Sequence, residues 1–155
     1  MAKPQVFETR FDVPVDYAFA WLTDFRPDDM KMADPKRAPA IRVTHRGGLI
    51  IREWSMMGMD FHTETTLEGT TRWVTASTIT RKGKPFARGG VVETLRQTPT
   101  GALHRAEITS EPLTLGAKLM APAFNVANKA NLDKLFREAK RRMETQHREG
   151  KPPTA

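Results

Sequence analysis

Glu93 and His104 are the residues of this chain whose types and spacing most clearly suggest acid–base chemistry. They flank a predicted two-residue turn at Pro99-Thr100, and a turn of that length fixes which strand residues face each other. In this register one mostly apolar face carries Val91, Glu93, Leu95, His104, Ala106 and Ile108. A carboxylate can orient an imidazole that moves protons, so His104 and Glu93 are the candidate catalytic pair. The alternatives are a buried hydrogen-bonded pair or solvated strand ends, and a one-residue slip would exchange the faces.

His62 and Glu64 form a second pair of chemically active residues, two positions apart on another predicted strand. Together with the first pair they offer imidazole and carboxylate groups of the kind that bind zinc or iron. Their spacing matches no metal motif such as HExxH, so we expect no metal site. In the simpler account both side chains face water, and the inward face of the strand carries Phe61, Thr63, Thr65 and Leu67. The chain also lacks cysteine, a glycine-rich phosphate loop and a GxSxG motif, so we expect no cofactor.

Leu115 to Gln146 is the only long segment with helical periodicity, and it must cover whatever site the strands form. Its core-facing stripe, at spacings of three and four residues, comprises Met120, Phe124, Ala127, Asn131, Leu135, Ala139 and Met143, and Leu132 and Phe136 widen it to the breadth that a core-facing helix needs. Gly150 and the Pro152-Pro153 pair end the helix. Pro122 leaves two alternatives, because the main helix either begins there or begins near Leu115 with a kink at the proline.

The remainder of the chain predicts a sheet. After a first strand at residues 5–11, the strand-length runs are residues 40–45, 49–57, 60–68, 72–80, 86–98 and 102–113. Short glycine-containing turns between them predict hairpins and hence antiparallel pairing. Two short helices, Val15–Leu22 and a second within Phe25–Met32, separate the first two strands. We therefore predict an α+β fold, with a curved seven-stranded antiparallel sheet around the long helix, a single domain at residues 1–148 and a flexible tail at residues 149–155.

The composition limits the class of protein. The chain has 155 residues and a formal net charge of +7, and no apolar run approaches the ~20 residues that a membrane span needs. The first residues lack the apolar core of a signal peptide, so we expect a cytoplasmic protein. Many basic residues lie near the C-terminus, either as a solvated helix face paired with acidic residues or as a contact for an acidic partner or anionic membrane. No aromatic residues interleave with them, so we expect no nucleic acid.

Two stretches resemble the helix-grip superfamily, which includes START lipid-transfer domains, Bet v1-like (birch-pollen-allergen-like) proteins and bacterial polyketide cyclase/dehydrase proteins (SRPBCC). FDVPVDYAFAWLTDFRPDDM, residues 11–30, is similar to the family's strand, Pro-opened helix and second short helix. PLTLGAKLMAPAFNVANKANLDKLFREAKRRME, residues 112–144, is similar to its closing helix. The resemblance covers nearly the whole chain and implies an apolar cavity between the sheet and the long helix. Members of this superfamily transport lipids, bind hormones or pigments, or cyclise polyketides, so the resemblance alone does not choose a function.

The first functional hypothesis is therefore a binding or carrier protein, monomeric or dimeric, for a hydrophobic small molecule such as a lipid or polyketide-like ligand. The expected ligand-binding residues are Trp54, Met56, Phe61, Trp73, Leu95, Ile108, Met120, Phe124, Ala127, Asn131 and Leu135. The alternative is a polyketide cyclase or dehydratase that uses His104 and Glu93 without metal or nucleotide cofactor. A further alternative is an interaction module that uses the basic face of the helix.

Overall fold

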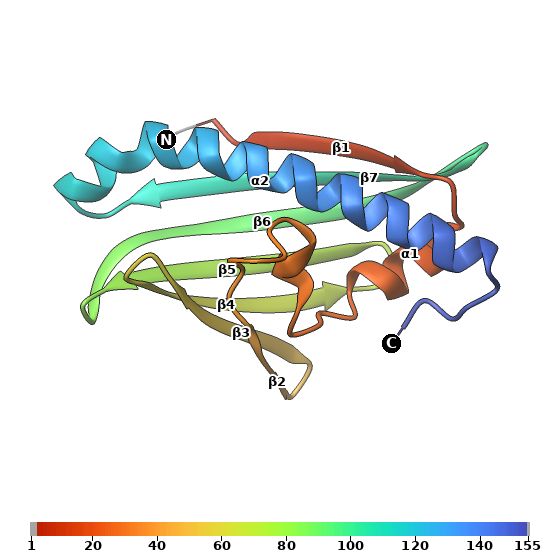
Figure 1. The fold of residues 1–155 in the computed structure, drawn as a ribbon, viewed down its shortest axis with the longest axis horizontal. Helices are drawn as coiled ribbons and strands as arrows, with labels where there is room; N and C mark the ends of the chain where they lie inside the picture. Colours follow the sequence, from red (N-terminus) through yellow and green to blue (C-terminus); the bar gives the residue numbers. More distant parts are fainter. Residues whose placement is uncertain (1–2, 155) are drawn as a thin grey trace.

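The computed structural model describes residues 3–154 and contains one seven-stranded antiparallel sheet with three helical segments (Figure 1). The strands are β1 (Gln5–Phe11), β2 (Arg42–Arg46), β3 (Leu49–Met56), β4 (Met59–Glu68), β5 (Arg72–Arg81), β6 (Lys84–Thr98) and β7 (Gly101–Pro112). Their order in the sheet is β1-β7-β6-β5-β4-β3-β2, so β1 and β2 are the two edges. This architecture confirms the helix-grip fold predicted from the sequence.

The helical segments are α1 (Val15–Leu22), the 3-10 turn η1 (Asp29–Met32) and α2 (Leu115–Arg148). The hydroxyl of Thr114 accepts a hydrogen bond from the backbone N–H of Ala117 at 3.1 Å, which satisfies one of the free donors at the start of α2. Pro122 lies inside α2, so of the two alternatives the structure selects a helix that begins at Leu115. Within residues 3–154 no helix combines the length and the apolar character that crossing a membrane requires.

Local turn chemistry fixes the register of the sheet. The β3–β4 hairpin turns at Met57 and Gly58, whose φ angles are +55° and +71°, and such paired positive angles match the twist of the flanking strands. The β6–β7 hairpin pairs Thr98 with Gly101, Leu95 with His104 and Glu93 with Ala106, which confirms the predicted two-residue loop. Gly101 must be glycine, because a Cβ there would lie 2.1 Å from the carbonyl oxygen of Phe11.

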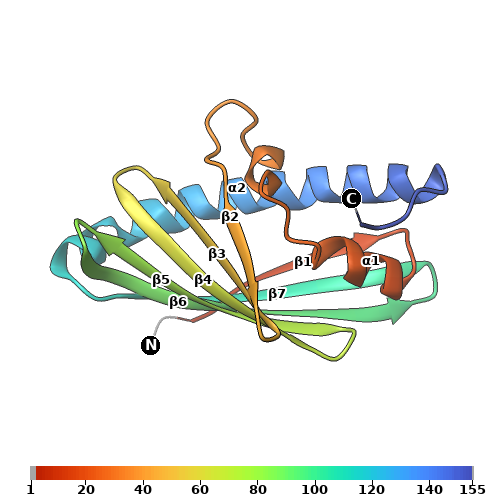
Figure 2. The same cartoon turned by 90° about the horizontal axis from the view of Figure 1, so that it is seen from below.

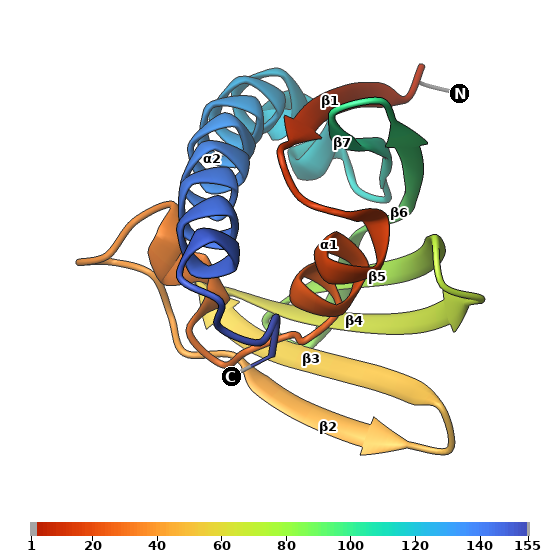
Figure 3. The ribbon, with the colours of Figure 1, turned by 90° about the vertical axis from the view of Figure 1, so that its right-hand side faces the viewer.

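The sheet curves so that one face, called here the inner face, is turned towards α2 (Figure 3). Cross-strand partners share a face, so each row of the register places its residues together. One inner row runs Trp73, Glu93, Ala106 and Phe7, and the next runs Leu95, His104 and Thr9. α1 lies over the same end of the sheet as the C-terminal half of α2 (Figures 1 and 2).

The helix α2 packs on the inner face at both ends. Its C-terminal half buries Phe136, Ala139 and Met143. Nearer its start Ala117 is buried in a second apolar cluster, together with Met59, Phe86 and Ala87, against which Phe124 packs. Each end therefore gains free energy from apolar burial and fixes the position of the helix above the sheet.

The middle of α2 is different, because residues 125–131 are all exposed. Asn128 lies four residues after Phe124 and four before Leu132, both of which pack against apolar clusters, so Asn128 faces the same way. A helix turn seated on a sheet would bury that residue. Ala127 and Asn131, which the sequence predicts on the core-facing stripe, are not buried either. The residues of α2 that pack in apolar clusters are Ala117, Phe124, Leu132, Leu135, Phe136, Ala139 and Met143, so most of the predicted stripe is confirmed.

This distribution of packing along α2 predicts where truncation of a side chain costs stability. Replacement of Met143, which is 0% exposed, by alanine should lower the free energy of unfolding by about 2–5 kcal/mol. Val126→Ala removes an apolar side chain of the same helix that is 74% exposed, and it should change that free energy by less than about 0.5 kcal/mol. Urea denaturation followed by circular dichroism measures both, and equal losses would contradict the burial of Met143 between α2 and the sheet.

Candidate functional site

His104 and Glu93 meet on the inner face, as the register predicts. The Nε2 atom of His104 lies 3.0 Å from Oε1 of Glu93, and the other carboxylate oxygen accepts a hydrogen bond from the indole N–H of Trp73 at 2.5 Å. A carboxylate only accepts hydrogen bonds, so Nε2 of the imidazole carries the proton that joins the pair. The two bonds fix the carboxylate, which in turn fixes the orientation of the imidazole ring.

Aromatic rings enclose His104, which is 0% exposed. Its imidazole stacks on Trp73 with centroids 5.8 Å apart and planes 14° apart, and the ring of Phe136 lies 5.1 Å away. Phe11 lies 6.0 Å away on β1. The second ring nitrogen, Nδ1, is buried and has no hydrogen-bond partner. In the neutral imidazole this nitrogen carries a lone pair, so it can accept a proton or a hydrogen bond from a bound molecule.

Arg52 brings a cation to the same interior from β3. Its register partner is Thr63, and it shares its strand face with Ile50 and Trp54. Burial lowers the pKa of Arg52 below its usual value, and the negative charges of Glu93 and Asp29 oppose that shift. Burial likewise raises the pKa of Asp29, whereas a hydrogen bond from the backbone N–H of Arg26 and the charges of Arg26 and Arg52 lower it. The charges of Glu93 and Asp29 thus act on Arg52 in the interior.

A strained backbone supports Arg52. Its guanidinium carbon lies 4.5 Å above the centre of the Phe25 ring, within range of a cation–π contact. Phe25 is buried and has a φ angle of +38°, a region that bulky residues rarely adopt. Strain of this kind persists only where the surroundings hold it, and it is concentrated at binding and catalytic sites. The backbone strain at Phe25, in the loop between α1 and η1, thus coincides with the contact of its ring with the Arg52 guanidinium.

The inner face carries several buried polar side chains, whereas the sequence predicted a mostly apolar lining. Thr63, Thr65 and Thr75 are buried there, and the hydroxyls of Thr65 and Thr75 hydrogen-bond to each other at 2.8 Å. Within residues 3–154 the buried side-chain atoms without a hydrogen-bond partner are Gln5 Oε1, Arg52 Nε, Trp54 Nε1 and His104 Nδ1. All four belong to inner-face residues by the register of β1, β3 and β7. Each such atom costs roughly 1–3 kcal/mol when it stays unpaired, so native proteins rarely leave them.

The predicted ligand-binding residues differ in burial between the strands and the helix. Trp54 and Phe61 stack face to face with centroids 5.1 Å apart, and both side chains are half-buried on the inner face. Trp73 and Leu95 are buried in the core near α1, and Met56, Ile108, Phe124 and Leu135 are half-buried. Met120 is 38% exposed, and Ala127 and Asn131 are exposed as described above. The strands thus bring their predicted residues to one face, while the helix presents its middle residues to solvent.

His62 and Glu64 lie on the outer face, which confirms the simpler account. The two ring nitrogens of His62 each lie 3.1 Å from a carboxylate oxygen, one from Glu53 and one from Glu64. Glu53 also accepts hydrogen bonds from Arg42 on β2. The groups border a shallow groove of about 530 Å³ on β2–β5. In the part of the chain that the structure describes, no three His, Asp or Glu side chains are arranged to hold a metal ion.

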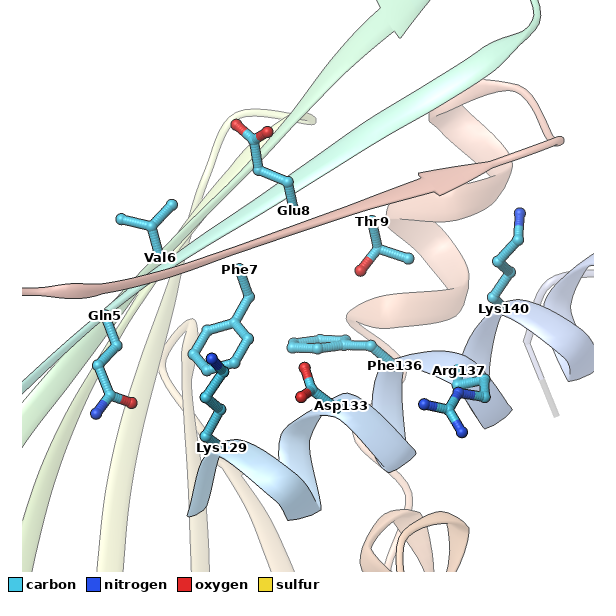
Figure 4. A pocket seen from close by; sticks show the side chains of 10 residues that line it. All are labelled: Gln5, Val6, Phe7, Glu8, Thr9, Lys129, Asp133, Phe136, Arg137 and Lys140. Atoms are coloured by element: carbon cyan, nitrogen blue, oxygen red, sulfur yellow. The ribbon is translucent and has the colours of Figure 1, made fainter. Parts of the chain in front are cut away.

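A larger groove, of about 700 Å³, separates the edge strand β1 from α2 (Figure 4). Phe7 and Phe136 face each other across its floor, with ring centroids 6.3 Å apart. Lys129, Asp133 and Arg137 line its helix wall. Since Phe136 also contacts His104, one aromatic ring separates this groove from the buried imidazole.

The basic face of α2 is partly neutralised. Arg141 and Arg142 both hydrogen-bond to Glu138, and their N–H groups lower the pKa of that carboxyl to about 2. Lys140 pairs with Glu144 and donates to the carbonyl of Arg10 at 2.6 Å, so it ties α2 to β1. The segment predicted as a tail lies against the N-terminal region, where Tyr17 donates its hydroxyl hydrogen to the carbonyl of Lys151 at 2.8 Å.

Sequence reasoning missed Arg52, Phe25 and Asp29. A signal for Arg52 was present, because alternation in β3 places it on the same face as Ile50 and Trp54. The positive φ angle of Phe25 has no comparable signal, since glycine or asparagine would be the expected residue there. Asp29 reads as an ordinary acidic residue at the start of a helical turn, and only the folding of the loop over Arg52 gives it a second role.

The charge cluster on the outer face predicts a dependence of stability on pH. Hydrogen bonds to Glu64 and then to Glu53 raise the pKa of His62 above its usual value. A raised pKa in the folded state means that the stabilisation is complete below the unfolded value of ~6.5 and is lost as pH rises through the folded value. In His62→Gln this component should disappear from the urea-denaturation free energy measured between pH 5 and 8. A wild-type profile identical to that of His62→Gln would contradict the assignment.

Comparison with known proteins identifies the fold. No family model and no curated protein matches the sequence. Among solved structures, a protein of Thermus thermophilus matches with a TM-score of 0.66 at 14% identity, over 90% of this chain and 96% of its own. Ara h 8.0201 matches with a TM-score of 0.58 at 13% identity, over 92% of this chain and 97% of its own.

DynU16, from the dynemicin biosynthetic locus, matches with a TM-score of 0.57 at 13% identity. The match covers 100% of this chain and 51% of the DynU16 chain. Likeness at these identities is a likeness of backbone, because so few side chains are shared. The chain therefore has the helix-grip fold that Ara h 8, a Bet v1 allergen, and the dynemicin-locus protein also have.

Proposed function

We propose that this protein binds an amphipathic small molecule, of the lipid or polyketide-like class, between the middle of α2 and the inner face of the sheet. The observation that carries the proposal is the exposure of Asn128 and its neighbours on the side of α2 that faces the sheet. A helix held at both ends and unpacked between them leaves room for a guest without disturbing the core. We call the space between residues 125–131 and the inner face the mid-helix space.

The surroundings of this space fit a molecule with an apolar body. The stacked Trp54 and Phe61 rings, together with Ile79 and Phe124, are half-buried, so a ligand that covered them would remove further apolar surface from water. Burial contributes about 25 cal/mol per Å² of apolar area, so covering a few hundred Å² supports micromolar affinity after the entropic cost of association.

The same surroundings fit a polar end. The unpaired Arg52 Nε and Trp54 Nε1, which lie two residues apart on the inner face of β3, are donors. A ligand that satisfied them would recover the free energy that each unpaired atom costs and would fix its own orientation. At the level of fold alone, the likeness to a protein from a biosynthetic locus supports a role with small molecules.

A second candidate function is proton transfer on the bound molecule, as in a polyketide cyclase or dehydratase. The observation that favours it is the hydrogen bond of Glu93 to Nε2 of His104, which leaves Nδ1 as the free base. Nδ1 would remove a proton from a carbon next to a ligand carbonyl and return it at another position, while Glu93 stabilises the imidazolium. This arrangement needs neither a metal nor a nucleotide.

Binding in the mid-helix space predicts a position-specific block. Asn128→Trp places a large ring into the space and should weaken binding of the neutral dye Nile red at least about tenfold. Ala130→Trp adds a large ring on the opposite side of the same exposed segment and should leave binding unchanged. Fluorescence titration measures both variants, and equal melting temperatures show that neither is unfolded. The proposal fails if the wild-type protein binds no apolar dye, or if both substitutions act alike.

Proton transfer predicts hydrogen exchange in a bound ketone. In D₂O the wild-type protein should accelerate deuterium incorporation next to the carbonyl of 2-undecanone, as followed by NMR. His104→Phe, which keeps an aromatic ring in the same enclosure, should abolish the acceleration while the ketone still binds. Exchange at the wild-type rate in His104→Phe would remove the catalytic role of His104 and leave the binding proposal standing.

A further inference from the structure

We propose that the outer face of the N-terminal half of α2, together with the adjoining β5–β6 hairpin, docks this protein onto a membrane surface that carries anionic lipid headgroups. The inference goes beyond the proposed function, because this face and the mid-helix space lie on opposite sides of α2 and docking requires no bound small molecule. Two observations carry it: an apolar stripe that faces solvent, and the unpaired basic residues that border the stripe.

The stripe, called here the outer stripe, has four residues at spacings of four, three and four, which lie on one side of a helix: Leu115, Leu119, Pro122 and Val126. Leu115, Leu119 and Val126 are 74%, 76% and 74% exposed, the highest values among the large hydrophobic side chains of residues 3–154. Ala117, two residues from each leucine, is buried in the cluster with Met59 and Phe86, so the outer stripe points away from the sheet. Packing within the protein thus leaves these side chains in water, as is typical of an interaction surface.

The start of α2 lies at one end of the molecule, beside the tips of two hairpins. The β3–β4 turn, the β5–β6 hairpin and the start of α2 are found together there in Figures 1 and 2. Leu113 donates its backbone N–H to the carbonyl of Phe86 on β6 at 3.0 Å, which joins the hairpin to the segment that leads into the helix. Met57, at the tip of the β3–β4 turn, is 69% exposed. This end therefore presents exposed apolar side chains from more than one element.

The charge of the same end is positive and mostly unpaired. No acidic residue occurs between Glu111 and Asp133, or in residues 69–92. Glu111 is already paired with Arg88 at 2.5 Å, which leaves the carboxylate of Asp60 as the acidic group of the β3–β4 turn. Within residues 3–154, the exposed basic side chains of this end that form no ion pair are Arg81, Lys82, Lys84, Lys118 and Lys129. The apolar stripe is thus bordered by cations that are free to meet an anionic partner.

The C-terminal half of α2 has basic residues too, but it lacks this combination. Arg141 and Arg142 pair with Glu138, and Lys140 pairs with Glu144. No large apolar side chain of residues 133–148 is exposed. The docking surface therefore belongs to the N-terminal half of the helix.

A membrane fits this surface better than a second copy of the chain or a folded protein partner. A two-fold interface between copies would bring Lys118 and Lys129 close to the same residues of the other copy, and like charges repel. A protein partner is anchored by side chains that enter pockets, and no residue of the outer stripe lines either of the two grooves described above. A fluid bilayer needs no pocket. Leucine and valine side chains enter its apolar boundary, while lysine ammonium groups reach the headgroup phosphates on flexible apolar stems.

The test measures co-flotation of the protein with vesicles of phosphatidylcholine alone, and with vesicles of phosphatidylcholine and phosphatidylglycerol in equal parts. Wild type should bind the mixed vesicles at least about tenfold more tightly than the neutral ones, and added salt should reduce that preference. Leu115→Ser combined with Leu119→Ser should weaken binding to mixed vesicles at least about tenfold, because two side chains no longer enter the apolar boundary. Lys118→Glu should weaken it at least about fivefold through the loss of charge attraction.

Matched controls lie at the opposite end of the sheet. Arg96→Glu makes the same change in net charge on β6 next to the β6–β7 turn, and Leu67→Ser removes an exposed leucine near the end of β4. Both should bind vesicles as wild type does. Melting temperatures show whether each variant is folded. Nile red titration without vesicles should give the same result for the double leucine variant as for wild type, which separates membrane docking from binding in the mid-helix space.

Three results would overturn the inference: no binding to either kind of vesicle, equal binding to both kinds, or equal losses in Lys118→Glu and Arg96→Glu. A dimer that light scattering detects in wild type and not in the double leucine variant would show that a second copy covers the outer stripe, and would also overturn it. Failure of wild type to bind Nile red would contradict the proposed function and leave the docking result standing.

Discussion

The long helix α2 is straight and the sheet that it covers is curved, so the two pack against each other at only some positions (Figures 1 and 3). Those positions determine which parts of the interior are filled. Apolar residues hold α2 at both ends, Phe124 and Ala117 at one and Phe136, Ala139 and Met143 at the other. Between them the sequence supplies asparagines and small residues, which have too little apolar surface to close the gap. The packing that stabilises the fold therefore comes from the two ends of the helix, and the proposed binding of a ligand uses its middle.

The interior that α2 covers is chemically mixed. Threonine hydroxyls, a cation over an aromatic ring and a carboxylate bonded to both an indole and an imidazole lie among apolar side chains. Several of these groups carry a cost, in desolvation at Arg52 and in backbone strain at Phe25. A protein that needed only a stable core would do better with aliphatic residues at these positions. These unfavourable groups are the reason for our proposal that the inner face recognises a ligand, in which an apolar body would provide affinity and fixed polar groups would provide orientation.

The sequence predicts most of this fold, and in the candidate site it predicts Glu93 and His104 but not Arg52, Phe25 or Asp29. Strand positions and the β6–β7 register are predictable because turn residues and alternation act locally, which is why the contact of Glu93 with His104 could be anticipated. The packed residues Leu132, Leu135, Phe136, Ala139 and Met143 of α2 were predictable too, but the exposure of Ala127 and Asn131 was not, because spacing alone does not show how closely each turn of a helix approaches the sheet. Arg52 was overlooked because an arginine in a strand normally points to water, and its partners Phe25 and Asp29 reach it through a loop whose path depends on tertiary contacts.

The distance between the middle of α2 and the sheet in solution decides whether the helix is seated only at its two ends. Nuclear Overhauser effects between Asn128 and the methyl groups of Thr63, Thr65 and Thr75 report separations below about 5 Å, the reach of neighbouring side chains in a packed core. We expect none in the free protein, and contacts from a bound ketone to both sides once ligand is added. Direct contacts between Asn128 and the threonine methyls in the free protein would mean that the helix is seated along its whole length, and would contradict the account.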